Sequence, residues 1–156
     1  MSDVILRVIP IAISLVALIV SAGTSFFTRK MKYQDAVKNY FQTGDSPEHK
    51  GYRCLIYELC ENNDDTIEAF KTNERAKEAA AHIVSFYELW YLLHVKGYLP
   101  IWAFSGIPGQ RAVRMYKLLT PYISWRLKDT KGYGVRFEKL VQRIQRKYGD
   151  GMDSLI

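Results

Sequence analysis

An uncharged run of twenty residues, Val8 to Phe27, constrains this chain more than any other feature of its sequence. As an α-helix, a run of that length crosses the roughly 30 Å hydrocarbon core of a bilayer. Three basic residues follow within positions 28–32, and basic residues beside a membrane helix favour the cytoplasmic side. The sequence therefore predicts a single transmembrane anchor over residues 1–30, with the N-terminus outside and the rest of the chain in the cytoplasm.

A cleaved signal peptide is the competing interpretation of this run. The triplet Val20-Ser21-Ala22 resembles a small-residue cleavage site. Asp3 before the run and the basic residues directly after it favour the anchor instead.

Within the anchor, small and hydroxyl-bearing residues recur at steps of three and four. They are Ser14, Ala17, Ser21, Thr24 and Thr28. A stripe of this kind is typical of close helix–helix contact or of a wet lumen, and a period of 3.5 predicts a left-handed supercoil of several copies. Three interpretations stay open: the stripe lines a pore, it is a tight oligomerisation seam, or it has no meaning.

The remaining sequence predicts an all-α fold, because no stretch alternates like a half-buried strand. We expect a cytoplasmic bundle of about five to six helices over residues 31–148 and a flexible tail over 149–156. The anchor helix should continue to a stop at Gly44, and Ser46-Pro47 should open the next helix.

Further along the chain, Asn73 should cap a central buried helix that ends before Gly97. Pro121 is expected to separate two helices, since proline favours the first turn of a helix. The final helix is predicted over Val135 to Tyr148, after two glycines.

Basic residues are concentrated in the last third of the chain. Residues 101–156 carry eleven bases and four acids, a net charge of +7. The residues that we expect to bind an anion or a nucleic acid are Arg111, Arg114, Lys117, Arg126, Lys128, Arg136, Lys139, Arg143 and Arg146. The last four fall at helical spacing and predict one basic stripe.

Three interpretations of the basic residues remain open. With aromatic residues such as Trp125 and Tyr133 nearby, they suit a single-stranded nucleic acid or a nucleotide. They would also suit anionic lipid headgroups of the cytoplasmic leaflet. An ordinary solvated helix face is the third interpretation.

The sequence gives no sign of an enzyme. It lacks a glycine-rich phosphate loop, a nucleophile elbow and a cysteine pattern for zinc, and its three histidines have no metal-ligand spacing. We therefore expect no catalytic residue, no metal and no cofactor. Glu88, inside the most apolar helix, is expected to form an ion pair with Arg53 or Arg126.

A family resemblance rests on two segments, ERAKEAAAHIVSFYELWYLLHVKGYLP and TPYISWRLKDTKGYGVRFEKLVQRI, that follow the anchor. Together they resemble a family of short bacterial membrane-anchored, all-helical proteins of unknown function. Within that family, the layout is similar to the membrane effector of Hailong-type anti-phage defence systems. That resemblance implies an inner-membrane channel held shut by single-stranded DNA oligomers, which a nucleotidyltransferase-like enzyme makes.

These features lead to one expected function. We expect a homo-oligomeric inner-membrane ion channel, with a tetramer favoured because three helices about 10 Å wide leave little lumen. Its basic cytoplasmic domain would bind a nucleotide or single-stranded DNA ligand that gates the pore. The alternative is a passive anchored adaptor that docks a protein partner or anionic lipid.

Overall fold

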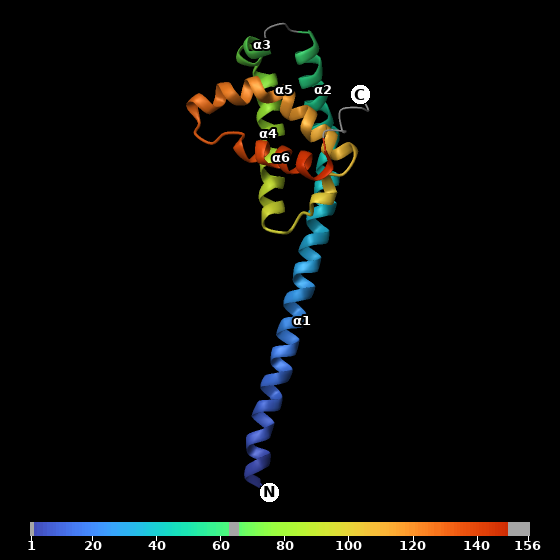
Figure 1. Ribbon diagram of the computed structural model, residues 1–156, viewed down its shortest axis with the longest axis vertical. Coiled ribbons are helices and arrows are strands. Elements are labelled where there is room, and N and C mark those ends of the chain that lie inside the picture. The colour runs from blue at the N-terminus through green and yellow to red at the C-terminus, as the bar shows by residue number, and fades with distance from the viewer. Residues whose placement is uncertain (1, 63–65, 150–156) are drawn as a thin grey trace. The chain divides into compact units, whose positions relative to one another are not determined.

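The computed structural model describes residues 2–62 and 66–149, and the side chains of 13–61 and 66–149. In the described part of the chain every regular element is helical (Figure 1). The elements are α1 (Ser2–Gly44), α2 (Pro47–Asn62), α3 (Thr66–Thr72), α4 (Glu74–Val95), the 3₁₀ turn η1 (Ile101–Phe104), α5 (Ile107–Asp129) and α6 (Val135–Tyr148). The predicted all-α class is therefore confirmed for these residues, and most of the predicted flexible tail lies outside them.

Two compact units divide the chain, Met1–Asp35 and Ala36–Ile156. The anchor predicted over residues 1–30 falls within the first unit. The last turns of α1, from Ala36 to Gly44, belong to the second.

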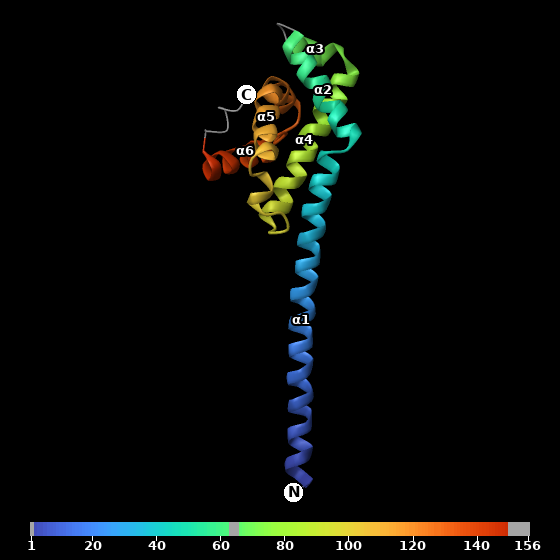
Figure 2. The same cartoon turned by 90° about the vertical axis from the view of Figure 1, so that its right-hand side faces the viewer.

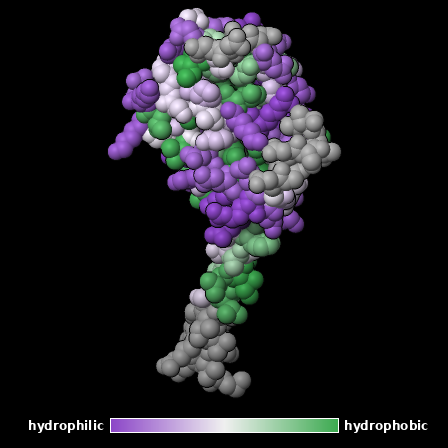
Figure 3. Space-filling model, turned by 45° about the horizontal axis from the view of Figure 1, so that its top comes forward, coloured by the Kyte–Doolittle hydropathy of each residue, from purple (hydrophilic) through white to green (hydrophobic). Residues whose placement is uncertain are grey.

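In the first unit, side chains 13–32 of α1 are all exposed. Large apolar residues among them leave 44% to 73% of their surface uncovered, including Leu15, Leu18 and Phe26. Figure 3 shows the same trend, because the coloured part of this segment is mostly green. From Ile13 onward the helix is long and apolar enough to cross a membrane, with a mean hydropathy of 1.2 in its best window. This helix thus carries an apolar surface that nothing in its own unit covers.

The second unit is built around α4, which contacts α2, α3, α5 and α6 (Figure 2). Most of its inward side chains, such as Ile83 and Val84, are completely buried. Aromatic rings fill the space around it: Tyr87 stacks on Phe137 of α6 with ring centres 4.4 Å apart. The expected central helix is therefore confirmed, although Leu89 on its outer face stays 51% exposed.

Several helix ends lie where the capping residues predict them. The side chain of Asn73 accepts a hydrogen bond from the backbone N–H of Ala76 and caps α4. After α4 the chain turns at Gly97, whose φ of 77° is the left-handed conformation that glycine tolerates. The bounds of α6 are those predicted from the sequence.

The expected break at Pro121 is wrong. Helix α5 continues through this proline from Ile107 to Asp129. Proline removes one backbone hydrogen bond of the helix, a loss that tertiary packing can offset. Here Leu119 on one side and Tyr122 on the other are both buried in the core, so packing holds the helix together across the proline.

Candidate ligand-binding site

The predicted basic stripe is present on α6. Its four members are all exposed: Arg136, Lys139, Arg143 and Arg146. The opposite side of the helix is buried in the core through Phe137, Leu140 and Ile144. Among the described residues no carboxylate forms an ion pair with any of the four. The stripe therefore presents four cations that lack an acidic partner in this part of the chain.

On α5 two of the predicted cations already face acids. Arg111 lies 3.5 Å from a carboxylate oxygen of Asp45, and Arg114 lies 3.7 Å from one of Glu61. The guanidinium of Arg114 also sits over the ring of Tyr57, 4.6 Å from its centre. Lys117 is exposed on the same helix. An incoming anion would compete with these carboxylates for Arg111 and Arg114.

At the end of α5, Arg126 is half-buried between two rings. Its guanidinium lies 5.9 Å from the centre of Trp125 and 5.6 Å from that of Tyr133. These aromatic rings therefore pack against the protein's own cation, whereas the sequence predicted them as platforms for bases. Lys128, the second-last residue of the helix, is exposed.

The seam residues of α1 are all exposed: Ser14, Ala17, Ser21, Thr24 and Thr28. The hydroxyl of Thr24 donates a hydrogen bond of 2.8 Å to the backbone carbonyl of Val20. A hydroxyl bonded in this way keeps its oxygen lone pairs available on the helix surface. The seam is exposed, as are the other side chains of residues 13–32.

A cavity of about 240 Å³ lies in the second unit, where the last turn of α1 meets the first turns of α2 and α5. Aromatic rings form one part of its wall: Tyr40, Phe41, Phe86 and Tyr87. Its polar lining consists of Asp45, His49, Arg53 and Arg111. Three of these four residues, Asp45, His49 and Arg53, were absent from the predicted site.

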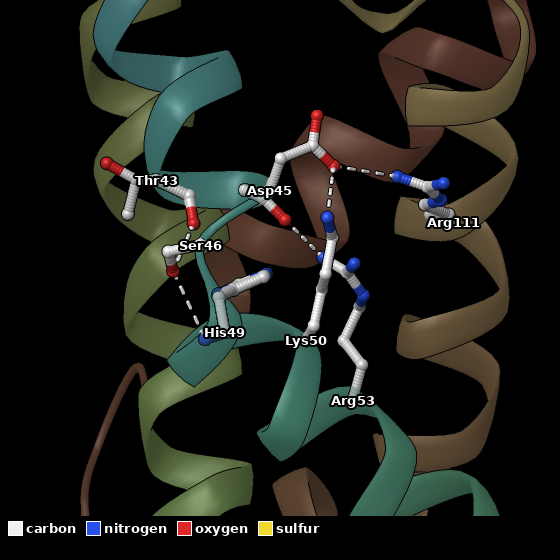
Figure 4. Close-up of polar contacts among 8 residues, drawn as sticks. Thr43, Asp45, Ser46, His49, Lys50, Arg53 and Arg111 are labelled. Atoms are coloured by element: carbon white, nitrogen blue, oxygen red, sulfur yellow. Dashed lines mark hydrogen bonds and ion pairs between the residues drawn. The ribbon is translucent and has the colours of Figure 1, made fainter.

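Figure 4 shows how the charged groups at this cavity are arranged. Arg53 is only 8% exposed and donates a 2.6 Å hydrogen bond to the backbone carbonyl of Gly44, the last residue of α1. Asp45 follows directly, and its carboxylate lies between Arg111 at 3.5 Å and Lys50 at 3.9 Å. The cavity therefore holds two guanidinium groups and, among its lining residues, a single carboxylate.

His49 is the most unusual group of the cavity. It is 1% exposed, and neither ring nitrogen has a hydrogen-bond partner. Burial, with further contributions from Arg53 and His82, lowers the pKa of His49 from 6.5 to about 3. The ring is therefore neutral near pH 7, with one N–H donor and one acceptor nitrogen unused.

The ion pair predicted for Glu88 is not formed. Arg53 bonds to Gly44, and Oε1 of Glu88 has no hydrogen-bond partner. No ion pair joins Glu88 to Arg126 in the described part of the chain either. Arg53, one of the two arginines expected to pair with Glu88, is buried, but its partner is the end of α1.

Sequence reasoning missed the cavity because its lining comes from four helices, α1, α2, α4 and α5. His49 and Arg53 lie one turn apart on α2, and this spacing places both on one face. That spacing was the only local signal. We compared the chain with family models, with curated proteins and with solved structures, and none of them matches it.

Proposed function

We propose that this protein is a membrane-anchored, homo-oligomeric ion channel whose cytoplasmic domain binds an anionic, nucleotide-type ligand. The observation that carries the proposal is the fully exposed α1 segment, on which a hydroxyl seam runs beside large apolar side chains. Lipid would cover the apolar side chains, and other copies would meet along the seam. The basic residues after the span favour an outside N-terminus and a cytoplasmic second unit.

In the assembled channel the seam would line the conducting path. The hydroxyls of Ser14, Ser21, Thr24 and Thr28 would replace part of the hydration shell of an ion. About four copies are the smallest number that leaves a lumen, given a helix width of about 10 Å. A tetramer is therefore the favoured assembly.

Ligand binding is proposed from the α6 stripe. Several copies of this cationic surface around one axis would repel each other, and a polyanion would relieve that repulsion. A ligand can gate the pore only if it binds the open and closed states with different strength. Single-stranded DNA or a nucleotide is the proposed ligand because its phosphates match four cations that pair with no acid among the described residues.

The layout shared with Hailong-type effectors supports a defence role for the channel. In that scheme a nucleotidyltransferase-like enzyme supplies single-stranded DNA oligomers that keep the inner-membrane channel shut. Loss of the ligand during infection would then open the pore and depolarise the cell.

A matched pair of substitutions tests the pore. Ala17 lies on the seam, whereas Ala22 lies one residue past Ser21 and is therefore turned away from it by about 100°. Ala17→Leu and Ala22→Leu make the same chemical change on different faces of the helix. Expressed in bacteria without the ligand-making enzyme, the wild type and Ala22→Leu should depolarise the membrane, as a potential-sensitive dye reports, and Ala17→Leu should not.

An anchored adaptor gives a different outcome from this experiment. The membrane potential would remain unchanged for all three proteins at equal expression. That result would overturn the channel proposal.

A further inference from the structure

We propose that the cavity between α1, α2 and α5 is a binding site for a phosphate monoester attached to a planar ring, such as the 5′-phosphate end of a nucleotide or oligonucleotide. In the unliganded state, the carboxylate of Asp45 stands in for that phosphate. The identity of the ligand as a nucleotide rests on the proposed function, whereas the existence of the cavity does not.

The cationic lining is the first argument. Arg53 and Arg111 both line the cavity, and guanidinium groups bind phosphate through paired N–H donors. Arg53 donates a hydrogen bond to the neutral carbonyl of Gly44, and no carboxylate in the described chain forms an ion pair with it. Helices α2 and α5 both begin at this cavity, so the positive ends of two helix dipoles face it.

The second argument is the buried and unsatisfied His49. Natural proteins rarely leave a buried polar group without a partner, because its lost hydration is costly. His49 lines the cavity, and at 1% exposure with both nitrogens unbonded it carries a donor and an acceptor that the fold itself leaves unsatisfied. A phosphate oxygen would accept from its N–H, and a sugar hydroxyl or protonated oxygen would donate to its other nitrogen.

The third argument is the shape and chemistry of the remaining wall. Phe41 lines the cavity with a ring that is 38% exposed, and Phe86, Tyr87 and Pro108 add apolar contacts. Burial keeps the pKa of Tyr87 above its usual value, so this phenol brings no negative charge near pH 7. At about 240 Å³ the cavity is smaller than the roughly 300 Å³ minimum typical of drug-sized ligand sites. It therefore suits one phosphorylated end of a ligand better than a whole oligomer.

Asp45 explains how the site can be held closed without ligand. Its carboxylate pairs with Arg111 and Lys50, yet its side chain is 57% exposed and can turn into solvent at little cost. Asp45 directly follows α1, so an incoming phosphate that displaces it acts on the residue after the end of that helix. This contact gives ligand binding a direct route to the helix that carries the hydroxyl seam.

Removing Asp45 tests the proposal through a gain of affinity, which misfolding cannot mimic. Asp45→Asn should tighten binding of dAMP and of a 5′-phosphorylated single-stranded DNA oligomer by about fivefold, the value of a partly exposed ion pair. Glu61→Gln is the matched control. It also removes one negative charge, but beside Arg114, which lies on α5 like Arg111. Binding is measured by calorimetry on the full-length protein in detergent.

Two further variants test whether the gain of affinity arises in the cavity. In the Asp45→Asn background, Arg111→Gln should cancel it. His49→Phe, which keeps a ring against Phe86 but removes both nitrogens, should weaken dAMP binding about fivefold. An equal effect of Asp45→Asn and Glu61→Gln would overturn the site and leave only a response to net charge.

The comparison of probes separates this inference from the proposed function. If oligomers with a 5′-phosphate and a 5′-hydroxyl bind equally well and Asp45→Asn changes neither, the cavity is not the site, and binding at the α6 stripe stands. If no oligomer binds but dAMP or inorganic phosphate responds to Asp45→Asn, the cavity stands and the proposed ligand fails. If no probe binds any variant, both fail.

Discussion

At the scale of single residues, His49 links the cavity to the stability of the fold. Its pKa is lowered to about 3 in the folded state by burial and by the neighbouring Arg53 and His82, against 6.5 for an exposed histidine. The unfolded chain therefore binds a proton more readily than the folded one below pH 6.5. Stability is fully present above that pH and falls as the solution is acidified toward pH 3.

This linkage predicts a measurable acid sensitivity. Between pH 7 and pH 5, the two pKa values imply a loss of about 2 kcal/mol in the free energy of unfolding from His49 alone. His49→Phe should lack this part of the slope. Thermal or denaturant unfolding of both proteins in mild detergent at the two pH values checks it, and equal slopes would contradict a buried neutral His49.

Only some of the roles of single residues could be predicted from the sequence. Asn73 and Gly97 could be assigned because a helix cap depends on a few neighbouring residues. Arg53 could not be paired correctly, because its partner is the backbone end of another helix, nine residues earlier in the chain. A cavity assembled from four helices leaves no local pattern beyond the one-turn spacing of His49 and Arg53.

At the scale of elements, the turn between α5 and α6 depends on a close approach of backbone to side chain. Gly134 has a φ of 75°, and a Cβ placed there would lie 2.5 Å from Cγ2 of Ile123. Gly132 has a φ of 84°, but a Cβ there would meet nothing within 4 Å. The two glycines therefore share the backbone strain and differ in the packing clash.

Alanine at these two positions should separate the two effects. Each substitution costs about 1 kcal/mol for the left-handed backbone. Gly134→Ala should lose roughly a further 1–3 kcal/mol, because Ile123 must move in a packed core. Unfolding midpoints of the two variants measure the difference, and equal destabilisation would show that Ile123 can move without a loss of stability.

The α6 stripe gives a second prediction at this scale. Replacing Lys139 and Arg143 with glutamine should reduce the affinity for single-stranded DNA and lower the slope of log K against log salt by about 1.4, near 0.7 for each lost phosphate contact. The control neutralises Lys71 and Lys77, two charges that pair with acids of their own helices. An equal effect of the two double variants would mean that net charge, and not the stripe, attracts the ligand.

Helix α5 shows where element prediction from sequence fails. From the local sequence, a proline after Thr120 predicts the start of a helix. Local preference is a weak guide, however, when residues on both sides are buried in the core. Leu119 and Tyr122 are buried on either side of Pro121, so the helix runs on. By contrast, the bounds of α6 followed from glycines and an amphipathic pattern that no tertiary contact opposes.

At the scale of the whole molecule, the sequence predicted one apolar helix followed by an all-helical unit, and the described chain has that organisation. Length, apolar content and periodicity are enough for this, because they are properties of long segments. Assembly is a property of several chains, and the sequence feature from which we predict it is the hydroxyl seam. The proposed channel therefore depends on copies meeting through that seam.

Single-channel recording of the purified protein in planar bilayers tests this claim most directly. The account predicts discrete conductance that single-stranded DNA on the cytoplasmic side closes, and it predicts that Ser21→Leu abolishes the conductance while the oligomer persists in detergent. A Ser21→Leu protein that conducts like the wild type, or a wild type that is monomeric and silent, would contradict it.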